Sequence, residues 1–135
     1  MDRRFQRNIP AISAEEQKLL AGKTVAVIGC GGLGGHLIEL LCRLGIGSIR
    51  VADGDAFEAS NLNRQLLSLA DNLGTSKAEA AAARIRAIAP ETKVTVHPVF
   101  LTGENAAEII GGCDAVLDAL DSPQIRRTQI GRAHV

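Results

Sequence analysis

A cluster of glycines and one later aspartate are the residues whose types and spacing best suit the binding of a nucleotide. The pattern G-x-G-x-x-G is met by the run Gly29-Cys30-Gly31-Gly32-Leu33-Gly34. Glycine lets the backbone turn sharply and approach a phosphate, and a helix that follows such a loop offers free N–H groups and a positive dipole end. Asp53 lies 19 residues after Gly34, where a carboxylate can accept hydrogen bonds from ribose hydroxyls. We therefore predict a nucleotide site formed by the backbone of this loop and by Asp53.

The predicted order of strands and helices places the glycine loop and Asp53 at one rim of a sheet. Residues 24–28 form an apolar, β-branched run typical of a strand buried on both faces, and the leucines of 37–44 recur at helical spacing. Further strands are predicted over 48–52, 93–97 and 115–118, and helices over 14–21, 61–69, 76–89 and 104–110. This alternation predicts an α/β fold with a Rossmann-like, mostly parallel sheet and helices on both faces. With four strands, we expect the sheet to be incomplete on its C-terminal side.

Composition narrows the class of protein. The chain has 135 residues, is 46% hydrophobic and carries 15 basic against 15 acidic residues, so its net charge is zero. A binder of nucleic acid that works through a strong basic field is therefore not expected, and with three Phe and no Trp or Tyr neither are platforms for stacking nucleic-acid bases. No apolar run is long enough to cross a membrane. Three widely spaced cysteines suggest reduced thiols, so we expect a cytoplasmic protein with no membrane partner.

The chain divides into three predicted segments. Residues 1–12 are read as an N-terminal arm and residues 13–129 as a nucleotide-binding domain that is truncated. Residues 130–135, with the sequence IGRAHV, fit no helical or strand periodicity and match one reading frame of a common sequencing adapter. We expect this tail to be non-native, and the alternative is a genuine frayed end.

The glycine loop and Asp53 suit an NAD- or FAD-binding domain as well as an ATP-binding one. The segment after Asp53 separates these alternatives. It contains Ser60-Asn61-Leu62-Asn63-Arg64-Gln65, then Gly74 with Lys77, and later Asp118-x-x-Asp121. In this order and spacing, together with the glycine loop, these motifs strongly resemble the adenylating domain of the ThiF/MoeB/HesA family, bacterial relatives of the ubiquitin-activating enzymes. The resemblance covers residues 3 to about 128.

The resemblance implies an adenylyltransferase reaction that uses ATP and Mg²⁺. The C-terminal Gly-Gly carboxylate of a ubiquitin-like sulfur-carrier protein attacks the α-phosphate of ATP, and pyrophosphate leaves. A carboxylate is already a nucleophile, so the site needs cations and a metal rather than a general base. The family's transfer cysteine and its zinc ligands lie beyond the present end of the chain, so a zinc site is expected only there.

Two basic residues are the candidates for the catalytic cations. Lys77 stands in the first turn of its predicted helix, where the helix dipole disfavours a cation by a few tenths of a kcal/mol or more, and this placement makes sense if phosphate oxygens lie in front of that helix. The alternative is a tolerated surface lysine. Arg64 carries a guanidinium suited to two phosphate oxygens, but it could instead pair with Glu58 or Asp55.

The remaining site residues follow from family position. Asp121 is the implied Mg²⁺ ligand and Asp118 its partner at the end of a strand, although without the resemblance Asp121 could simply cap the next helix. Asn61 would contact phosphate or order its loop. Ser60 and Asp55 complete the expected nucleotide contacts.

Arg7 matches an arginine that crosses a homodimer interface in this family and reaches the partner's ATP. An arginine supplied in this way would make dimerisation a condition for activity. The alternative for this region is a disordered basic tail.

Two hypotheses from other classes stay open at this point. An NAD-dependent oxidoreductase would use Asp53, but it gives no role to Arg64, Lys77 or Asp121. A non-catalytic fragment that binds a nucleotide or a partner is the other.

Overall fold

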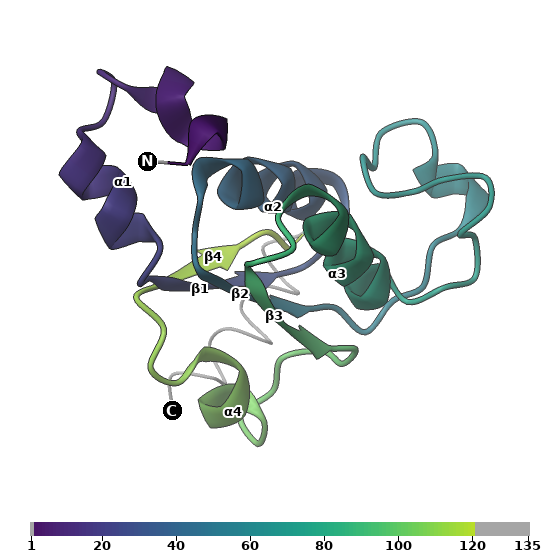
Figure 1. Cartoon of the computed structure of the whole chain (residues 1–135). Coiled ribbons are helices and arrows are strands. Elements are labelled where there is room, and N and C mark those ends of the chain that lie inside the picture. Colours follow the sequence, from purple (N-terminus) through teal and green to yellow (C-terminus); the bar gives the residue numbers. More distant parts are fainter. Residues whose placement is uncertain (1, 121–135) are drawn as a thin grey trace.

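The computed structural model describes residues 2–120, and it contains one parallel sheet. The strands are β1 (Thr24–Ile28), β2 (Ser48–Ala52), β3 (Lys93–His97) and β4 (Ala115–Asp118), in the spatial order β3-β2-β1-β4. Helices α2 (Gly32–Leu44) and α3 (Lys77–Ile88) cover one face of the sheet, and α4 (Ala106–Ile110) lies against the other (Figure 1). The predicted Rossmann-like α/β fold with helices on both faces is confirmed. Asp121 and the predicted tail 130–135 lie outside the described residues.

The four strands have the predicted bounds, and most predicted helices occur. Helix α1 (Ala14–Leu20) starts with the capping box expected from its sequence, since Ser13 Oγ accepts from the Glu16 N–H and the Glu16 carboxylate accepts from the Ser13 N–H. Helix α2 begins earlier than its leucine pattern indicated, at Gly32, and ends at Gly45 in the left-handed conformation.

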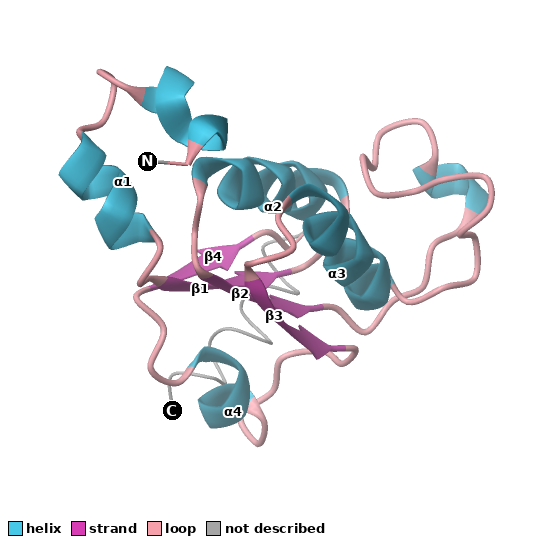
Figure 2. Cartoon of the chain, in the orientation of Figure 1, coloured by secondary structure: helices cyan, strands magenta, loops and turns pink. Residues whose placement is uncertain are grey.

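The helix predicted over 61–69 is wrong. The structure has one 3₁₀ turn at Ala59–Asn61 and then a series of turns, which form the long pink connection at the right of Figure 2. The Asn72 side chain explains the difference, because its Oδ1 accepts from the Leu69 N–H and its Nδ2 donates to the Leu67 carbonyl, both at 2.8 Å. Such side-chain bonds offer the backbone an alternative to the helical ladder.

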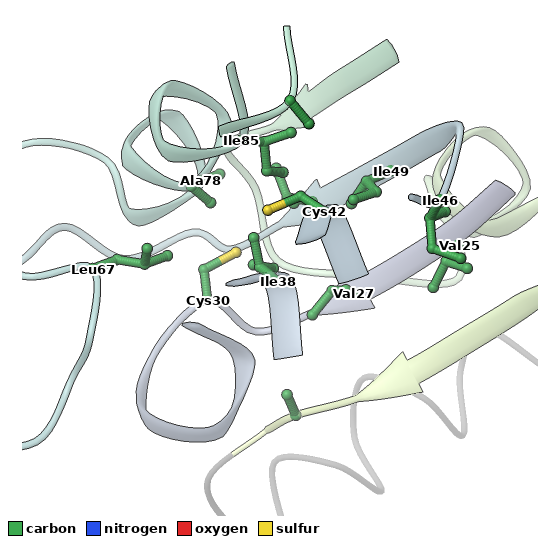
Figure 3. Close-up of a cluster of buried hydrophobic side chains, with 14 of the residues drawn as sticks. Val25, Val27, Cys30, Ile38, Cys42, Ile46, Ile49, Leu67, Ala78 and Ile85 are labelled. Atoms are coloured by element: carbon green, nitrogen blue, oxygen red, sulfur yellow. The ribbon is translucent and has the colours of Figure 1, made fainter. Parts of the chain in front are cut away.

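Two apolar clusters hold the sheet between its helices. The larger lies between the sheet and the α2–α3 layer, and Figure 3 shows Ile38 and Cys42 of α2 and Ile85 of α3 packed over Val27 and Ile49 of the strands. The smaller lies on the other face and consists of Ala26, Ile28, Ala52, Leu101, Ala106 and Ile109. Because β1 and β2 contribute side chains to both clusters, the carboxyl ends of these strands are held in fixed positions.

Glu39 links the two helices of the larger layer. Its carboxylate accepts from Arg84 of α3 at 2.7 and 2.8 Å and from Arg43 of α2 at 2.9 and 3.1 Å. The Arg84 hydrogen bond is the main cause that lowers the pKa of Glu39 to about 2. The carboxylate is largely covered while both arginines are half exposed, so solvent screens the interaction.

We expect Glu39→Gln to lower the free energy of unfolding by about 1 kcal/mol at pH 7. Because the folded-state pKa lies below the ordinary value of 4.5, this stabilisation is present above pH 4.5 and is lost as the pH falls toward 2. Urea unfolding of both proteins across this range measures the difference. The control is Glu104→Gln, which removes an exposed carboxylate without an ion pair among residues 2–120. An unfolding difference for Glu39→Gln that persists unchanged at pH 2 would contradict the assignment.

The N-terminal arm packs against the amino end of the sheet. It forms a 3₁₀ helix, Arg3–Asn8, whose Arg4 pairs with Glu91 at 2.6 Å and whose Asn8 donates to the Gln17 Oε1 at 2.8 Å. Gln17 in turn donates to the carbonyl of Leu44 at 2.7 Å. The part of the arm from residue 2 onward is therefore ordered against the domain, and the alternative of a disordered tail does not describe it.

Within residues 2–120, none of the helices combines the length and the apolar character needed to cross a lipid bilayer.

Candidate nucleotide-binding site

A cleft of about 320 Å³ opens at the carboxyl ends of the strands. Its walls come from the glycine loop, the ends of β2 and β4, the loop after β3 and the start of α3, and the residues are Gly29, Gly31, Ala52, Asp53, Asp55, Lys77, Val99, Phe100, Ala119 and Leu120. The carboxyl rim of an open parallel sheet is where α/β folds bind ligands, and this volume falls in the usual range of small-molecule sites. In the structure, the glycine loop, Asp53 and Lys77 all line this cleft.

The glycine loop leaves the start of α2 open to a ligand. Gly29 has a φ of +98°, and a Cβ at Gly34 would overlap the carbonyl oxygen of Gly29, so both positions require glycine. The N-cap of α2 is Gly31, and no side chain caps the helix. A Cβ at Gly32 would meet nothing within 4 Å. Among residues 2–120, no side chain therefore caps the first N–H groups of α2, which suits them to bind phosphate oxygens.

Asp53 joins the glycine loop to the end of β2. Its Oδ2 accepts from the Cys30 N–H and its Oδ1 from the Asp55 N–H, both at 2.8 Å. Burial raises the pKa of Asp53, and these two backbone donors partly oppose that rise. Each carboxylate oxygen has two lone pairs, so both can still accept a further bond from a ribose hydroxyl. The residue thus has a structural role, which its position alone did not reveal, alongside the predicted ribose contact.

Lys77 is brought to the cleft by the closure of the long connection between β2 and α3. Ala56 pairs with Ser76 as an isolated antiparallel bridge, and the Lys77 N–H donates to the Asp55 carbonyl at 3.0 Å. The lysine is the first residue of α3 and only 6% exposed. Its Nζ lies 5.6 Å from the centre of the Phe57 ring, and it forms no ion pair with a residue of the described segment 2–120.

A buried cation that forms no ion pair among residues 2–120 carries a desolvation cost in the folded state. The cation–π contact with Phe57 offsets part of that cost. The reading of Lys77 as an ordinary surface lysine is wrong, because the side chain is buried and lines the cleft. Lys77 and the uncapped N-terminus of α2 can together bind a polyanion.

Several predicted site residues do not line the cleft. Arg64 is exposed, and its Nη1 donates to the Ser60 carbonyl at 3.1 Å and to the Asn63 Oδ1 at 3.0 Å, while neither Glu58 nor Asp55 pairs with it. Ser60 and Asn61 belong to the same 3₁₀ turn, and the Asn61 side chain orders that turn. Arg7 is exposed in the arm at the amino end of the sheet. The predicted metal ligand Asp121 falls outside the described residues.

Two features of the site were missed from the sequence. Val99 and Phe100 line the cleft, and the signal for them was an apolar, aromatic pair directly after a strand that ends at the same rim. Gln65 is buried, its Oε1 has no hydrogen-bond partner within the described part of the chain, and its amide group lies 3.3 to 3.5 Å from the position a Cβ would take on Gly31. No pattern in the sequence distinguished Gln65 from its polar neighbours.

The thiol of Cys30 does not belong to the cleft. It is fully buried and points into the larger core cluster, toward Ile38 in Figure 3. Burial raises the pKa of this thiol well above its ordinary value, with the charge of Asp53 adding to the effect. Cys30 is therefore a small packing residue in a crowded turn rather than a nucleophile.

Comparison with known proteins shows which enzymes this chain resembles. A sulfur carrier protein adenylyltransferase of Thermus thermophilus is 39% identical over 117 residues, which are 87% of this chain and 43% of that protein. A tRNA threonylcarbamoyladenosine dehydratase of Escherichia coli is 44% identical over 106 residues, which are 78% of this chain and 40% of that protein. The chain therefore spans less than half the length of these relatives.

A crystal structure of the Escherichia coli dehydratase in complex with ATP superimposes with a TM-score of 0.83 and 41% identity, covering 88% of this chain and 49% of that one. The model of the ThiF family matches residues 5–133. With the glycine loop, Asp53 and Lys77 gathered at one rim of a parallel sheet, and with this match over nearly its whole length, the chain belongs to the ThiF family.

Proposed function

We propose that this chain is the ATP-binding part of an adenylyltransferase that activates the C-terminal Gly-Gly carboxylate of a ubiquitin-like sulfur-carrier protein. The observation that carries the proposal is the buried Lys77, unpaired among residues 2–120, in a cleft that also holds the uncapped start of α2 and the Asp53 carboxylate. A dinucleotide oxidoreductase would give this lysine no role. The relative from Thermus thermophilus, named a sulfur carrier protein adenylyltransferase, supports the choice of substrate.

In the proposed reaction, a carboxylate oxygen of the carrier forms a bond to the α-phosphorus of ATP. The bond between that phosphorus and the oxygen bridging to the β-phosphate breaks, and pyrophosphate leaves with the bonding electrons. The N–H groups at the start of α2 bind phosphate oxygens, Asp53 binds the ribose hydroxyls, and Lys77 stabilises the charge that accumulates on the phosphates. No side chain has to remove a proton, because the attacking carboxylate is already ionised.

Magnesium is part of this proposal. In nucleotide sites, Mg²⁺ takes one or two protein carboxylates and completes its shell with phosphate oxygens and water. Residues 2–120 contain no group of three or more His, Cys, Asp or Glu that could hold a metal ion alone. Asp121 stays the predicted protein ligand. When bound, the ion would draw negative charge from the phosphates and ease the approach of the carboxylate.

We also propose that the active protein is a homodimer in which Arg7 serves the partner's cleft. The arm that carries Arg7 packs near Gly45 and Glu91, at the amino ends of β2 and β3, whereas the cleft lies at their carboxyl ends. Arg7 is thus on the wrong end of its own domain to reach its own nucleotide. Arg64 stays a prediction as the second cation, and it would have to leave Ser60 and Asn63 to reach the phosphates.

A cytoplasmic location belongs to the same proposal. All three cysteines are unpaired, and two of them are buried in the core. Free thiols of this kind are typical of a reducing compartment.

The test of the proposed function is exchange of labelled pyrophosphate into ATP. With Mg²⁺ and a carrier that ends in a free Gly-Gly carboxylate, we expect exchange well above background, because the adenylate forms reversibly. A carrier amidated at its C-terminus is the matched control and is expected to give none, since it lacks the nucleophile. Exchange that proceeds equally with the amidated carrier would overturn the proposal.

The Escherichia coli relative favours a second candidate, an enzyme that acts on tRNA carrying threonylcarbamoyladenosine. That nucleoside also presents a carboxylate, so the same cleft chemistry would serve. The zero net charge of the chain weighs against it, because a tRNA partner is normally held by a basic surface. Modified tRNA in place of the carrier in the exchange assay separates the two candidates.

A further inference from the structure

We propose that Phe100 is the platform on which the base of the bound nucleotide stacks. This inference rests on the proposed function, since it requires a nucleotide in the cleft. Phe100 lies beyond the end of β3, lines the cleft and is 46% exposed. A half-exposed aromatic ring inside a cleft has a flat apolar surface available, and every nucleobase has a complementary π-face.

The backbone that carries Phe100 is fixed on both sides. The next residue, Leu101, is 1% exposed and anchors the loop in the smaller core cluster. The Asn105 side chain donates to the Phe100 carbonyl at 2.9 Å and accepts from the Thr102 N–H at 2.7 Å. The ring is therefore held at the rim by a loop with internal hydrogen bonds, which reduces the entropy lost when a base binds to it.

The ring also lies directly beside the predicted ribose contact. A Cβ on Gly54 would come within 2.6 Å of the Cδ2 and Cε2 atoms of Phe100, so the ring packs on the backbone between Asp53 and Asp55. If Asp53 binds the ribose hydroxyls, the base leaves the adjacent carbon of the same sugar. A base attached there is within reach of the Phe100 ring, whereas the phosphates extend toward Lys77 and the start of α2.

No other aromatic residue of the chain can take this role. The sequence contains three Phe and no Trp or Tyr; Phe57 is buried at 2% exposure beneath Lys77, and Phe5 packs against Gly45 at the amino end of the sheet. The expectation from composition that the chain lacks stacking platforms concerned nucleic-acid surfaces and does not extend to a single ring in a cleft.

The neighbours of Phe100 indicate how the base is recognised. Val99 and Leu120 also line the cleft with apolar side chains, and of its polar side chains Asp53 binds ribose and Lys77 binds phosphates in the proposed function. Among the described lining residues, only the Asp55 carboxylate is then left as a polar side chain for the edge of the base. Recognition by stacking on the face of the base favours purines over pyrimidines, because the purine ring system is larger.

The first experiment compares binding of ATP and of inorganic tripolyphosphate by calorimetry. Phe100→Leu keeps an apolar side chain but removes the ring, and we expect it to bind ATP about 10-fold more weakly while its affinity for tripolyphosphate stays within about 2-fold. Phe100→Tyr keeps the ring and should retain ATP affinity. Equal losses for both ligands, or no loss of ATP affinity in Phe100→Leu, would overturn the proposal.

A second experiment uses fluorescence, because the chain has no Trp or Tyr. Phe100→Trp introduces a single fluorophore at the proposed platform, and ATP should quench it whereas tripolyphosphate should not. The matched control is Leu19→Trp, on an exposed position of α1 at the other end of the sheet, where ATP should have no effect. Quenching by both ligands, or by neither, speaks against stacking at residue 100.

These measurements distinguish a failure of the proposed function from a failure of the inference about Phe100. If the wild-type chain binds neither ATP nor tripolyphosphate, the proposed function fails and the role of Phe100 fails with it. If ATP binds and the Lys77→Met variant weakens it, but Phe100→Leu does not, only the inference about Phe100 is wrong.

Discussion

Replacing Lys77 with methionine is expected to lower ATP–pyrophosphate exchange by about 100-fold or more. The side chain lines the cleft, is 6% exposed and forms no ion pair with a residue of the described part of the chain. Its charge is thus held in place before the nucleotide arrives, and in a buried site such a preorganised charge stabilises the transition state strongly. Methionine keeps an unbranched apolar stem of similar length and removes the charged ammonium group.

The same substitution should leave the protein at least as stable as before. Removing a buried charge that forms no ion pair among residues 2–120 relieves a desolvation cost, so we expect the melting temperature of Lys77→Met to be equal or higher. Loss of exchange without loss of stability separates a catalytic role from a structural one. Lys23→Ala is the matched control, since this lysine is exposed between α1 and β1, and its exchange rate should equal that of the wild type. Exchange retained by Lys77→Met would remove the central support of the proposed function.

Replacing Gly34 with alanine is expected to destabilise the domain by about 3 kcal/mol, which for a chain of this size lowers the melting temperature by about 10 °C. The added Cβ would overlap the carbonyl oxygen of Gly29 and lie 3.4 Å from the Ala119 Cβ. Both neighbours belong to strand ends of the central sheet, so the loop cannot move aside without shifting the rim of the cleft. We therefore expect ATP binding to be lost together with stability.

Gly32→Ala provides the control in the same loop. A Cβ at this position meets nothing within 4 Å, and the residue starts α2, where alanine is a better helix former. Its melting temperature should match that of the wild type or exceed it. Thermal unfolding followed by circular dichroism measures the melting temperature of both variants. Equal melting temperatures for Gly34→Ala and Gly32→Ala would contradict the close approach of Gly34 to the Gly29 carbonyl oxygen.

The elements of this fold could be predicted because their signals are local. The β-branched run of β1 and the capping box at Ser13 and Glu16 depend on residues within one turn or one strand of each other. The position of Asp53 at the end of β2 follows from the same local reading, because parallel strands bring their carboxyl ends to one edge. The helix expected over 61–69 is absent for a local reason too, since the Asn72 side chain binds the Leu69 N–H and the Leu67 carbonyl.

Sequence alone thus determined the strands, the glycine loop and the rim at which a nucleotide would bind, because each depends on neighbours in the chain. Only the tertiary structure decided that Lys77 is buried in the cleft, that Arg64 lies outside it and that the ring of Phe100 packs beside Asp53. Those outcomes depend on how the connection between Ala56 and Ser76 closes and on where the loop after β3 returns. Contacts between residues far apart in the chain set the burial of a side chain, and no local pattern encodes them.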